Sequence, residues 1–351
     1  MKLPLVLSAI LIPAHLLAQE TGDYPSLPSQ VFSTYAPKDI AEHTPESMAQ
    51  VAQDFLDGLD ESLRSQASLP FDSPEKARWT NVPPRGPQGG VRLGDLNAEQ
   101  LEGALDLLAA VLSPQGYAKA RNIPLADDRL LRNGQRRPGF GAEDYWLALF
   151  GAPSAVEPWA LQFDGHHLAI NLAFHGEGMS LSPTFIGTQP RGFELGGETL
   201  EPMKKKDEAA LALLRSLSQS QREEAILGDR RANLVAGAGR DGKIPKVVGV
   251  SAKGFDEAQR AALFAVIDLY VGDLPQSFAE MRRTELESET DQMTFGWWGP
   301  TEEGGDFSYR IQGPSLIIEY AGQDLGGDPH DHLHSIYRDP TNEYGARLGA
   351  K

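Results

Sequence analysis

The stretch 159-WALQFDGHHLAINL-172 consists of two runs of alternating apolar and polar residues that meet at Asp164-Gly165. Asp-Gly between alternating runs is the strongest short-range indication of a β-hairpin. Alternate residues of a strand point to the same face, so one set in the second run should lie in a core. These predicted core residues are Leu168, Ile170, Leu172 and Phe174.

A second hairpin is predicted further along the chain, over residues 307–320, with its turn at Gly313-Pro314. A glycine-rich link, residues 322–327, follows it, and a last strand is expected at about residues 331–337. Two hairpins that are not separated by regular crossover helices favour an antiparallel sheet over a parallel one.

Amphipathic helices are predicted between these hairpins and before them. The first begins after Pro45, and its apolar residues recur at spacings of three and four. This stripe is Met48, Val51, Phe55, Leu59 and Leu63. Three further helix starts share a capping residue followed three positions later by glutamine, which is the capping-box spacing. These pairs are Asn97 and Gln100, Ser218 and Gln221, and Asp256 and Gln259. One alternative is a weak internal repeat, but the unequal spacing argues against a solenoid, and shared capping chemistry is the simpler explanation.

Together these elements predict an α+β fold in which amphipathic helices pack on a mostly antiparallel sheet built from at least two β-hairpins. Residues 1–18 have the order of a signal peptide: Lys2, an apolar run, and a small residue at Ala18. We expect an extended lead-in over residues 19–44 and a single large α+β domain over residues 45–351. Residues 69–94 are rich in proline and glycine and should form a long irregular connection.

Composition limits the partners of the chain. It has 49 acidic and 32 basic residues, a formal charge of −17 and no cysteine. This charge argues against nucleic acid as a partner, and the absence of cysteine excludes disulfides and a lipid-bearing cysteine. The apolar run is too short and interrupted for a stable membrane anchor, so a periplasmic or extracellular location is expected. The one basic run, Lys204 to Lys206, is interpreted as a solvated helix entry.

Six of the eight histidines fall in two segments that are far apart in the chain. They are His166, His167 and His175 in the first segment, and His330, His332 and His334 in the second. Residues i and i+2 of a strand point to one face about 6 to 7 Å apart, so His332 and His334 can reach one ion. We therefore predict a metal site formed by His332, His334 and one of the adjacent pair His166 and His167, the other supporting it.

Two acids near the second segment, Glu319 and Asp331, are candidates for a ligand, a partner of an imidazole, or a general base.

Several motifs in the same order resemble the family catalogued as domain of unknown function 3500 (DUF3500), from about residue 45 to the end. They are PW at 158–159, DGHHLAIN at 164–171, PTFIG at 183–187, WWG at 297–299, YRIQGP at 309–314, IEY at 318–320, HLHS at 332–335 and RDP at 338–340. The resemblance adds Arg310 and Arg338 to the candidate catalytic residues, and it implies a protein that is often exported but brings no established activity.

The leading hypothesis is an exported metal-dependent enzyme, a hydrolase or an oxidoreductase, that acts on a small molecule or a peptide. Its cofactor would be a divalent transition metal, either copper, zinc or iron. The alternative is a non-catalytic protein that binds a metal or a small ligand outside the cytoplasm. A third hypothesis, a purely structural module, predicts that the histidines lie apart on the surface. The oligomeric state stays open.

Overall fold

The structure is a computed structural model that describes residues 26–38, 42–86, 88–131, 137–325 and 327–348. The predicted signal peptide lies outside these ranges. Within them, nine α-helices accompany a sheet of twelve strands and a separate two-stranded hairpin. The helices are α2 (Leu27–Thr34), α3 (Pro45–Asp57), α4 (Glu61–Ala67), α5 (Ala98–Val111), α6 (Pro114–Asp127), α7 (Lys204–Ser216), α8 (Gln219–Ala225), α9 (Glu257–Val271) and α10 (Gln276–Ser288).

The large sheet is mixed but mostly antiparallel. Its strands are β1 (Ser68–Leu69), β2 (Val91–Arg92), β3 (Tyr145–Phe150), β4 (Trp159–Gly165), β5 (Leu168–His175), β6 (Gly178–Thr188), β9 (Ile226–Gly228), β10 (Val250–Ser251), β11 (Thr294–Trp298), β12 (Ser308–Gly313), β13 (Leu316–Gly322) and β14 (Leu333–Arg338). The order is β1-β3-β4-β5-β6-β14-β13-β12-β11-β10, with β2 beside β3 and β9 beside β11. Strands β7 (Phe193–Leu195) and β8 (Glu198–Leu200) form the separate hairpin. The predicted α+β class is confirmed.

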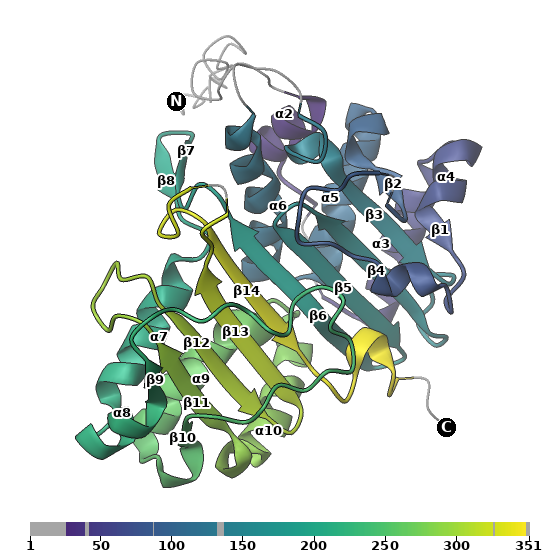
Figure 1. Ribbon diagram of the computed structural model, residues 1–351. Coiled ribbons are helices and arrows are strands. Elements are labelled where there is room, and N and C mark those ends of the chain that lie inside the picture. The colour runs from purple at the N-terminus through teal and green to yellow at the C-terminus, as the bar shows by residue number, and fades with distance from the viewer. Residues whose placement is uncertain (1–25, 39–41, 87, 132–136, 326, 349–351) are drawn as a thin grey trace, which may run out of the picture.

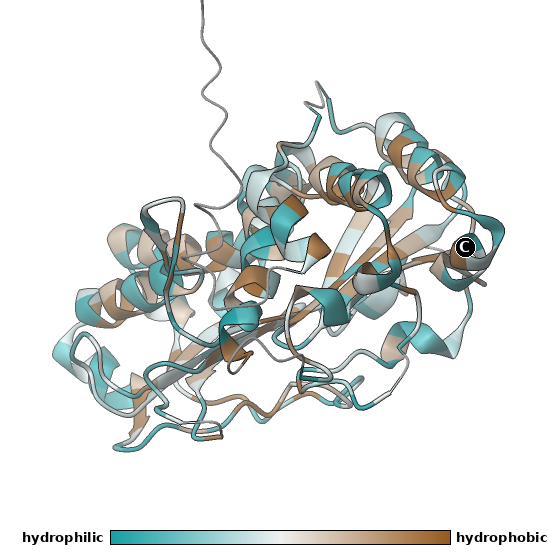
Figure 2. Ribbon diagram, turned by 90° about the horizontal axis from the view of Figure 1, so that it is seen from above, coloured by the Kyte–Doolittle hydropathy of each residue, from teal (hydrophilic) through white to brown (hydrophobic). Residues whose placement is uncertain are grey.

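Helices cover one face of the sheet, while two long segments, residues 70–86 and 229–249, cross the other face (Figures 1 and 2). Because strand residues alternate between faces, the central strands β5, β6, β13 and β14 each contribute to a core on both faces. The four core residues predicted in the first hairpin all lie in the large core that includes the helices. A smaller core on the opposite face joins Trp79 and Ala236 of the crossing segments to Phe185 and Ile336 of the sheet.

The helix predictions hold with two corrections. All three predicted capping boxes are present. The stripe that begins at Met48 is divided between two helices, because α3 ends at Asp57 and Asp60 caps α4. The lead-in is not extended throughout, since α2 lies within it. Ser26 caps α2 and Pro28 occupies its first turn, which are favourable helix-start positions for these residues.

The chain folds as two halves that repeat one order of elements. The order α4, β1, β2, α5, α6 and then β3 to β6 recurs as α8, β9, β10, α9, α10 and then β11 to β14. In each half, a parallel and an antiparallel short strand pair one after the other along the outer edge of the first strand of a four-stranded meander. The meanders meet where β6 pairs with β14.

Cross-strand side chains repeat as well. Gln162 bonds Asn171 across the first hairpin at 2.6 Å, and Arg310 bonds Glu319 across the second at 2.7 Å. Gln162 and Arg310 each also donate to a backbone carbonyl of the segment that crosses their half. The capping boxes at Asn97 and Asp256 occupy matching positions at the starts of α5 and α9, so an internal repeat accounts for this pair, whereas the box at Ser218 starts α8 and matches α4.

The basic run is only partly solvated. Lys204 and Lys205 are exposed in the first turn of α7, but Lys206 is buried. Its Nζ donates to Ser335 Oγ at 3.0 Å and lies 3.7 Å from the centre of the Tyr270 ring. Burial lowers the pKa of Lys206 well below its ordinary value, because the charged amine loses its hydration.

We expect Lys206→Met to raise the free energy of unfolding at pH 7, because methionine removes the cost of burying the amine; replacing buried ion pairs by apolar side chains gains about 1 to 4 kcal/mol, and we expect a gain of that order. The unfolded chain holds the Lys206 proton more tightly than the folded state does, so this penalty is present at low pH and fades as pH rises toward the unfolded pKa. Urea unfolding at pH 7 and pH 10 measures both effects. Lys205→Met, on the exposed side of the same helix, is the control and should change little.

Candidate metal centre

His166 and His167 form the turn of the first hairpin. The sequence places this turn at Asp164-Gly165, but Gly165 pairs with Leu168 as the last residue of β4, which moves the turn on by two residues. Gly165 packs against Tyr145, and a Cβ on it would lie 2.7 Å from that ring. His167 takes a φ of 69°, a left-handed conformation that is costly for a residue with a side chain.

Strand pairing brings the second histidine segment to this turn. His334 lies in β14 opposite Gly187 of β6, and the Gly187 N–H donates to His167 O at 2.6 Å. A Cβ on Gly187 would stand 2.8 Å from the His334 ring and 3.2 Å from the His167 ring. A glycine is thus needed here, because the two rings pass over its backbone.

Three imidazole nitrogens face one another at this point. His332 Nε2 lies 2.8 Å from His167 Nε2 and 3.0 Å from His334 Nε2. The exposed fractions of the three residues are 1% for His167, 6% for His332 and 7% for His334. His332 Nδ1 donates to Leu325 O at 2.6 Å, which leaves an unprotonated Nε2 lone pair directed at the other two rings.

The surroundings favour neutral rings. Burial lowers the pKa of His167 to about 3, and it lowers the pKa of His334 well below its usual range. The pKa of His332 is also lowered, again mainly by burial. Neutral imidazoles are the form in which histidine binds a metal ion.

Asp127, the last residue of α6, lies beside the turn and is fully buried. Its Oδ1 accepts a hydrogen bond from His166 Nδ1 at 2.6 Å and lies 3.6 Å from His167 Nδ1. Its Oδ2 accepts from the Gly141 N–H at 2.8 Å. Burial alone would raise the pKa of Asp127, but the two imidazoles outweigh it and lower the pKa to about 2. Asp127 is therefore an ionised carboxylate.

The residues form two buried groups whose ligand atoms lie within 4.8 Å of one another. One group is His167, His332 and His334, and the other is Asp127, His166 and His167. His166 stacks on His167 with 3.6 Å between ring centres. The structure thus joins both remote segments and separates the roles of the adjacent pair, since His167 faces the second segment and His166 faces Asp127.

Two other residues predicted for the site, Glu319 and Arg310, contact the crossing segment of residues 229–249 and not the histidine groups. Glu319 Oε1 accepts from Arg310, and Glu319 Oε2 accepts from the backbone N–H groups of Val235 and Ala236. Arg310 also lies over Trp298, at 5.5 Å from that ring. The contacts of this pair hold residues 229–249 against the sheet.

Arg338 also contacts residues 229–249, whereas Asp331 contacts Arg191. Arg338 is buried and donates to the carbonyl oxygens of Ala236 and Gly237, and it also forms ion pairs with Asp241 and Glu343. Asp331, which precedes His332, accepts from the Arg191 backbone N–H at 2.9 Å. The remaining two histidines of the predicted segments lie outside both groups. His175 contacts Leu348 O, and His330 is exposed.

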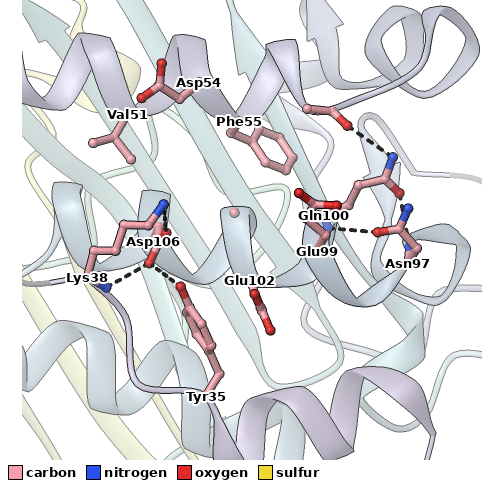
Figure 3. A pocket seen from close by; sticks show the side chains of 12 residues that line it. Tyr35, Lys38, Val51, Asp54, Phe55, Asn97, Glu99, Gln100, Glu102 and Asp106 are labelled. Carbon is pink, nitrogen blue, oxygen red and sulfur yellow. Dashed lines mark hydrogen bonds and ion pairs between the residues drawn. The ribbon is translucent and has the colours of Figure 1, made fainter.

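A cavity of about 430 Å³ lies elsewhere, between α3 and α5 (Figure 3). Asp106 on its wall accepts from Tyr35 Oη at 3.0 Å and from the Lys38 N–H at 2.9 Å. Asp54, Glu99 and Glu102 also line it, but no residue of either histidine group does. Its acidic groups therefore do not belong to the candidate metal centre.

The fold and the site define an α+β protein with two adjoining groups of buried imidazoles and a carboxylate that could hold a metal. Residues 41–346 match the family model described as "Protein of unknown function (DUF3500)", so the chain belongs to the DUF3500 family, and the resemblance in the sequence is confirmed. Comparison with curated proteins and with solved structures finds no match. No helix in the described ranges is long and apolar enough to cross a membrane.

Proposed function

We propose that this protein is an exported metal-dependent enzyme whose ion is bound by His167, His332 and His334. The observation that carries this proposal is the meeting of three buried Nε2 atoms at 2.8 and 3.0 Å. These nitrogens lie within hydrogen-bond distance of one another, and neutral imidazoles arranged in this way can direct their Nε2 lone pairs at one cation. Three imidazole ligands are also a common set for a catalytic metal, because they leave a further position for water or substrate.

The second half of the chain supports a role for the histidines beyond folding. Its matching hairpin turn contains Pro314 and Ser315 in place of the two histidines. Glu289, at the end of α10, accepts from both the N–H and the hydroxyl of Ser315, as Asp127 at the end of α6 contacts the first turn. The same scaffold therefore forms without imidazoles, so the fold itself does not require them.

The reaction depends on the metal. Zinc would supply a Lewis acid for hydrolysis, whereas copper or iron would supply redox chemistry. In this proposal, Asp127 is the carboxylate that orients the imidazoles. A small molecule or a peptide is the proposed substrate class. Catalytic roles for Glu319, Asp331, Arg310 and Arg338 stay predictions, and Asp331 is the one adjacent in sequence to a proposed ligand.

Metal analysis tests the proposal. Protein purified without an affinity tag is expected to contain at least one copper, zinc or iron ion per chain, measured by inductively coupled plasma mass spectrometry. The double variant His332→Ala, His334→Ala should lose at least one ion per chain. His330→Ala changes an exposed histidine of the same segment and should keep the wild-type content. A metal-free native protein, or equal content in the double variant, would refute the proposal.

Low exposure favours one competing function, a metal-binding protein without turnover. The three proposed ligands are at most 7% exposed, and a closed coordination shell is typical of structural or storage sites. Azide added to the cobalt-substituted protein distinguishes the two functions. A change in the visible absorption spectrum indicates an open position and supports catalysis, and an unchanged spectrum supports the competing function.

Export is proposed from residues 1–18 alone. When the full chain is expressed in a bacterial host, the mature protein is expected outside the cytoplasm with Gln19 at its N-terminus, because cleavage follows a small residue such as Ala18. N-terminal sequencing of the exported fraction measures this. Intact residues 1–18 in protein that stays in the cytoplasm would contradict it.

A further inference from the structure

We propose that Asp127, His166 and His167 bind a second metal ion, so that the His167 ring bridges two ions. This inference rests on the proposed function, because the first ion is the one bound through His167 Nε2. It assigns the centre two ions per chain and makes His166 a ligand instead of a support.

The first argument is the position of His167 between the two groups. Its Nε2 faces His332 at 2.8 Å, and its Nδ1 lies 3.6 Å from the Asp127 carboxylate. Within the described ranges, this Nδ1 is a buried ring nitrogen without a hydrogen-bond partner. A buried polar atom that lacks a partner costs about 1 to 3 kcal/mol, so an unpaired Nδ1 directed at a carboxylate calls for an explanation.

The second argument is the arrangement of the donor atoms. His166 stacks on His167 at an interplanar angle of 28°, and the Nδ1 atoms of both rings lie near the same oxygen of Asp127. The three ligand atoms lie within 4.8 Å of one another, and their residues are at most 5% exposed. Two imidazoles and one carboxylate form a ligand set that suits zinc, copper or iron.

The local structure favours a cation at this point. Asp127 ends α6, a helix of 14 residues, and the carbonyl end of a helix carries partial negative charge. Neighbouring side chains hold His166 in place as well. The Tyr145 hydroxyl donates to His166 O, and Phe140 packs edge-on against the His166 ring at 4.7 Å. The donor set is therefore held in place by the protein before any ion binds.

Bridging determines the protonation of His167. Each ring nitrogen gives its lone pair to one ion, so His167 binds as an imidazolate, and its Nδ1 proton passes to solvent when the second ion binds. The Asp127 carboxylate and this imidazolate together contribute two negative charges toward the four positive charges of two divalent ions. His166 Nδ1 likewise gives up its hydrogen bond to Asp127 and uses the neutral tautomer protonated at Nε2.

The stoichiometry of zinc binding tests the inference. Mature protein is stripped with a chelator, loaded with Zn²⁺, freed of excess metal and analysed by mass spectrometry. We expect two zinc ions per chain in the wild type and one in His166→Gln. Asp127→Asn is a second variant with the same expectation. His330→Gln should keep two ions, and circular dichroism checks that each variant is folded.

Copper gives an independent spectroscopic measurement. Two Cu²⁺ ions joined by one imidazolate couple their spins, so the wild type should show a weakened electron paramagnetic resonance signal per copper, and His166→Gln should restore the signal of an isolated ion. One ion in the wild type, unchanged by His166→Gln, would overturn this inference and leave the proposed function intact. No bound ion in the wild type would overturn both.

Discussion

His167→Asn is expected to abolish metal binding while the protein stays folded. His167 belongs to both buried groups, so its replacement removes a ligand from each. Asparagine is chosen because His167 has a φ of 69°, and asparagine adopts this left-handed conformation more readily than most residues. The variant therefore keeps the backbone of the turn and removes the two ring nitrogens.

The difference should appear most clearly in stability with and without metal. A ligand that binds only the folded state adds about 4 kcal/mol to the free energy of unfolding at a concentration 1,000 times its Kd. The wild type should show this gain in Zn²⁺, and His167→Asn should show none. Urea unfolding in chelator and in excess Zn²⁺ measures both proteins.

His175→Asn is the matched control, since His175 lies at the far end of β5, outside both groups. It should keep the zinc-dependent gain of the wild type. An equal gain in His167→Asn and in the wild type would show that His167 is not a ligand. An unfolded His167→Asn protein in chelator would show that the ring is needed for folding, contrary to the argument from Pro314 and Ser315.

Local patterns in the sequence were sufficient to predict individual elements but not their assembly. The hairpins around Asp164-Gly165 and Gly313-Pro314 follow from alternation and turn residues, which act over a few positions. Each turn nevertheless falls one or two residues later than predicted, at His166-His167 and at Pro314-Ser315, because the strand pairing continues through the residues that the pattern assigns to the turn. The pairing of β6 with β14 joins residues about 150 positions apart, and no local pattern encodes it.

The candidate site, too, could be predicted only in part from local sequence patterns. His332 and His334 were identifiable because a spacing of two places side chains on one face of a strand. Asp127 was not identifiable, since it is one of 49 acidic residues and becomes special only through its position at the end of α6 beside the turn. Glu319 was a candidate for chemistry because it is an acidic residue in a predicted strand, but its partners are Arg310 and the backbone of residues 229–249.

The crossing segment of residues 229–249 explains why charged residues are buried outside the candidate metal centre. Residues 229–249 contain no helix or strand, so their backbone groups need partners from the sheet. Glu319 accepts from the N–H of Ala236, while Arg338 donates to the carbonyl of the same residue. One acid and one base thus satisfy both backbone groups of a residue that is itself fully buried.

Arg338→Met is accordingly expected to lower the free energy of unfolding by about 3 to 5 kcal/mol, the range for breaking a buried ion pair from one side. The Arg338 side chain is 1% exposed, and its loss would leave the carbonyl oxygens of Ala236 and Gly237 and the carboxylates of Asp241 and Glu343 without this donor. Methionine keeps much of the volume, so a cavity contributes little to the loss.

Urea unfolding measures the total, and hydrogen exchange should show faster exchange of the Ala236 amide than of amides in β4. Arg310→Met, which removes the exposed contact to Lys246 O and the pairing with Glu319, should cost less. A loss below about 1 kcal/mol for Arg338→Met, the level of an exposed ion pair, would show that the segment is held by its apolar contacts around Trp79 and not by the arginine.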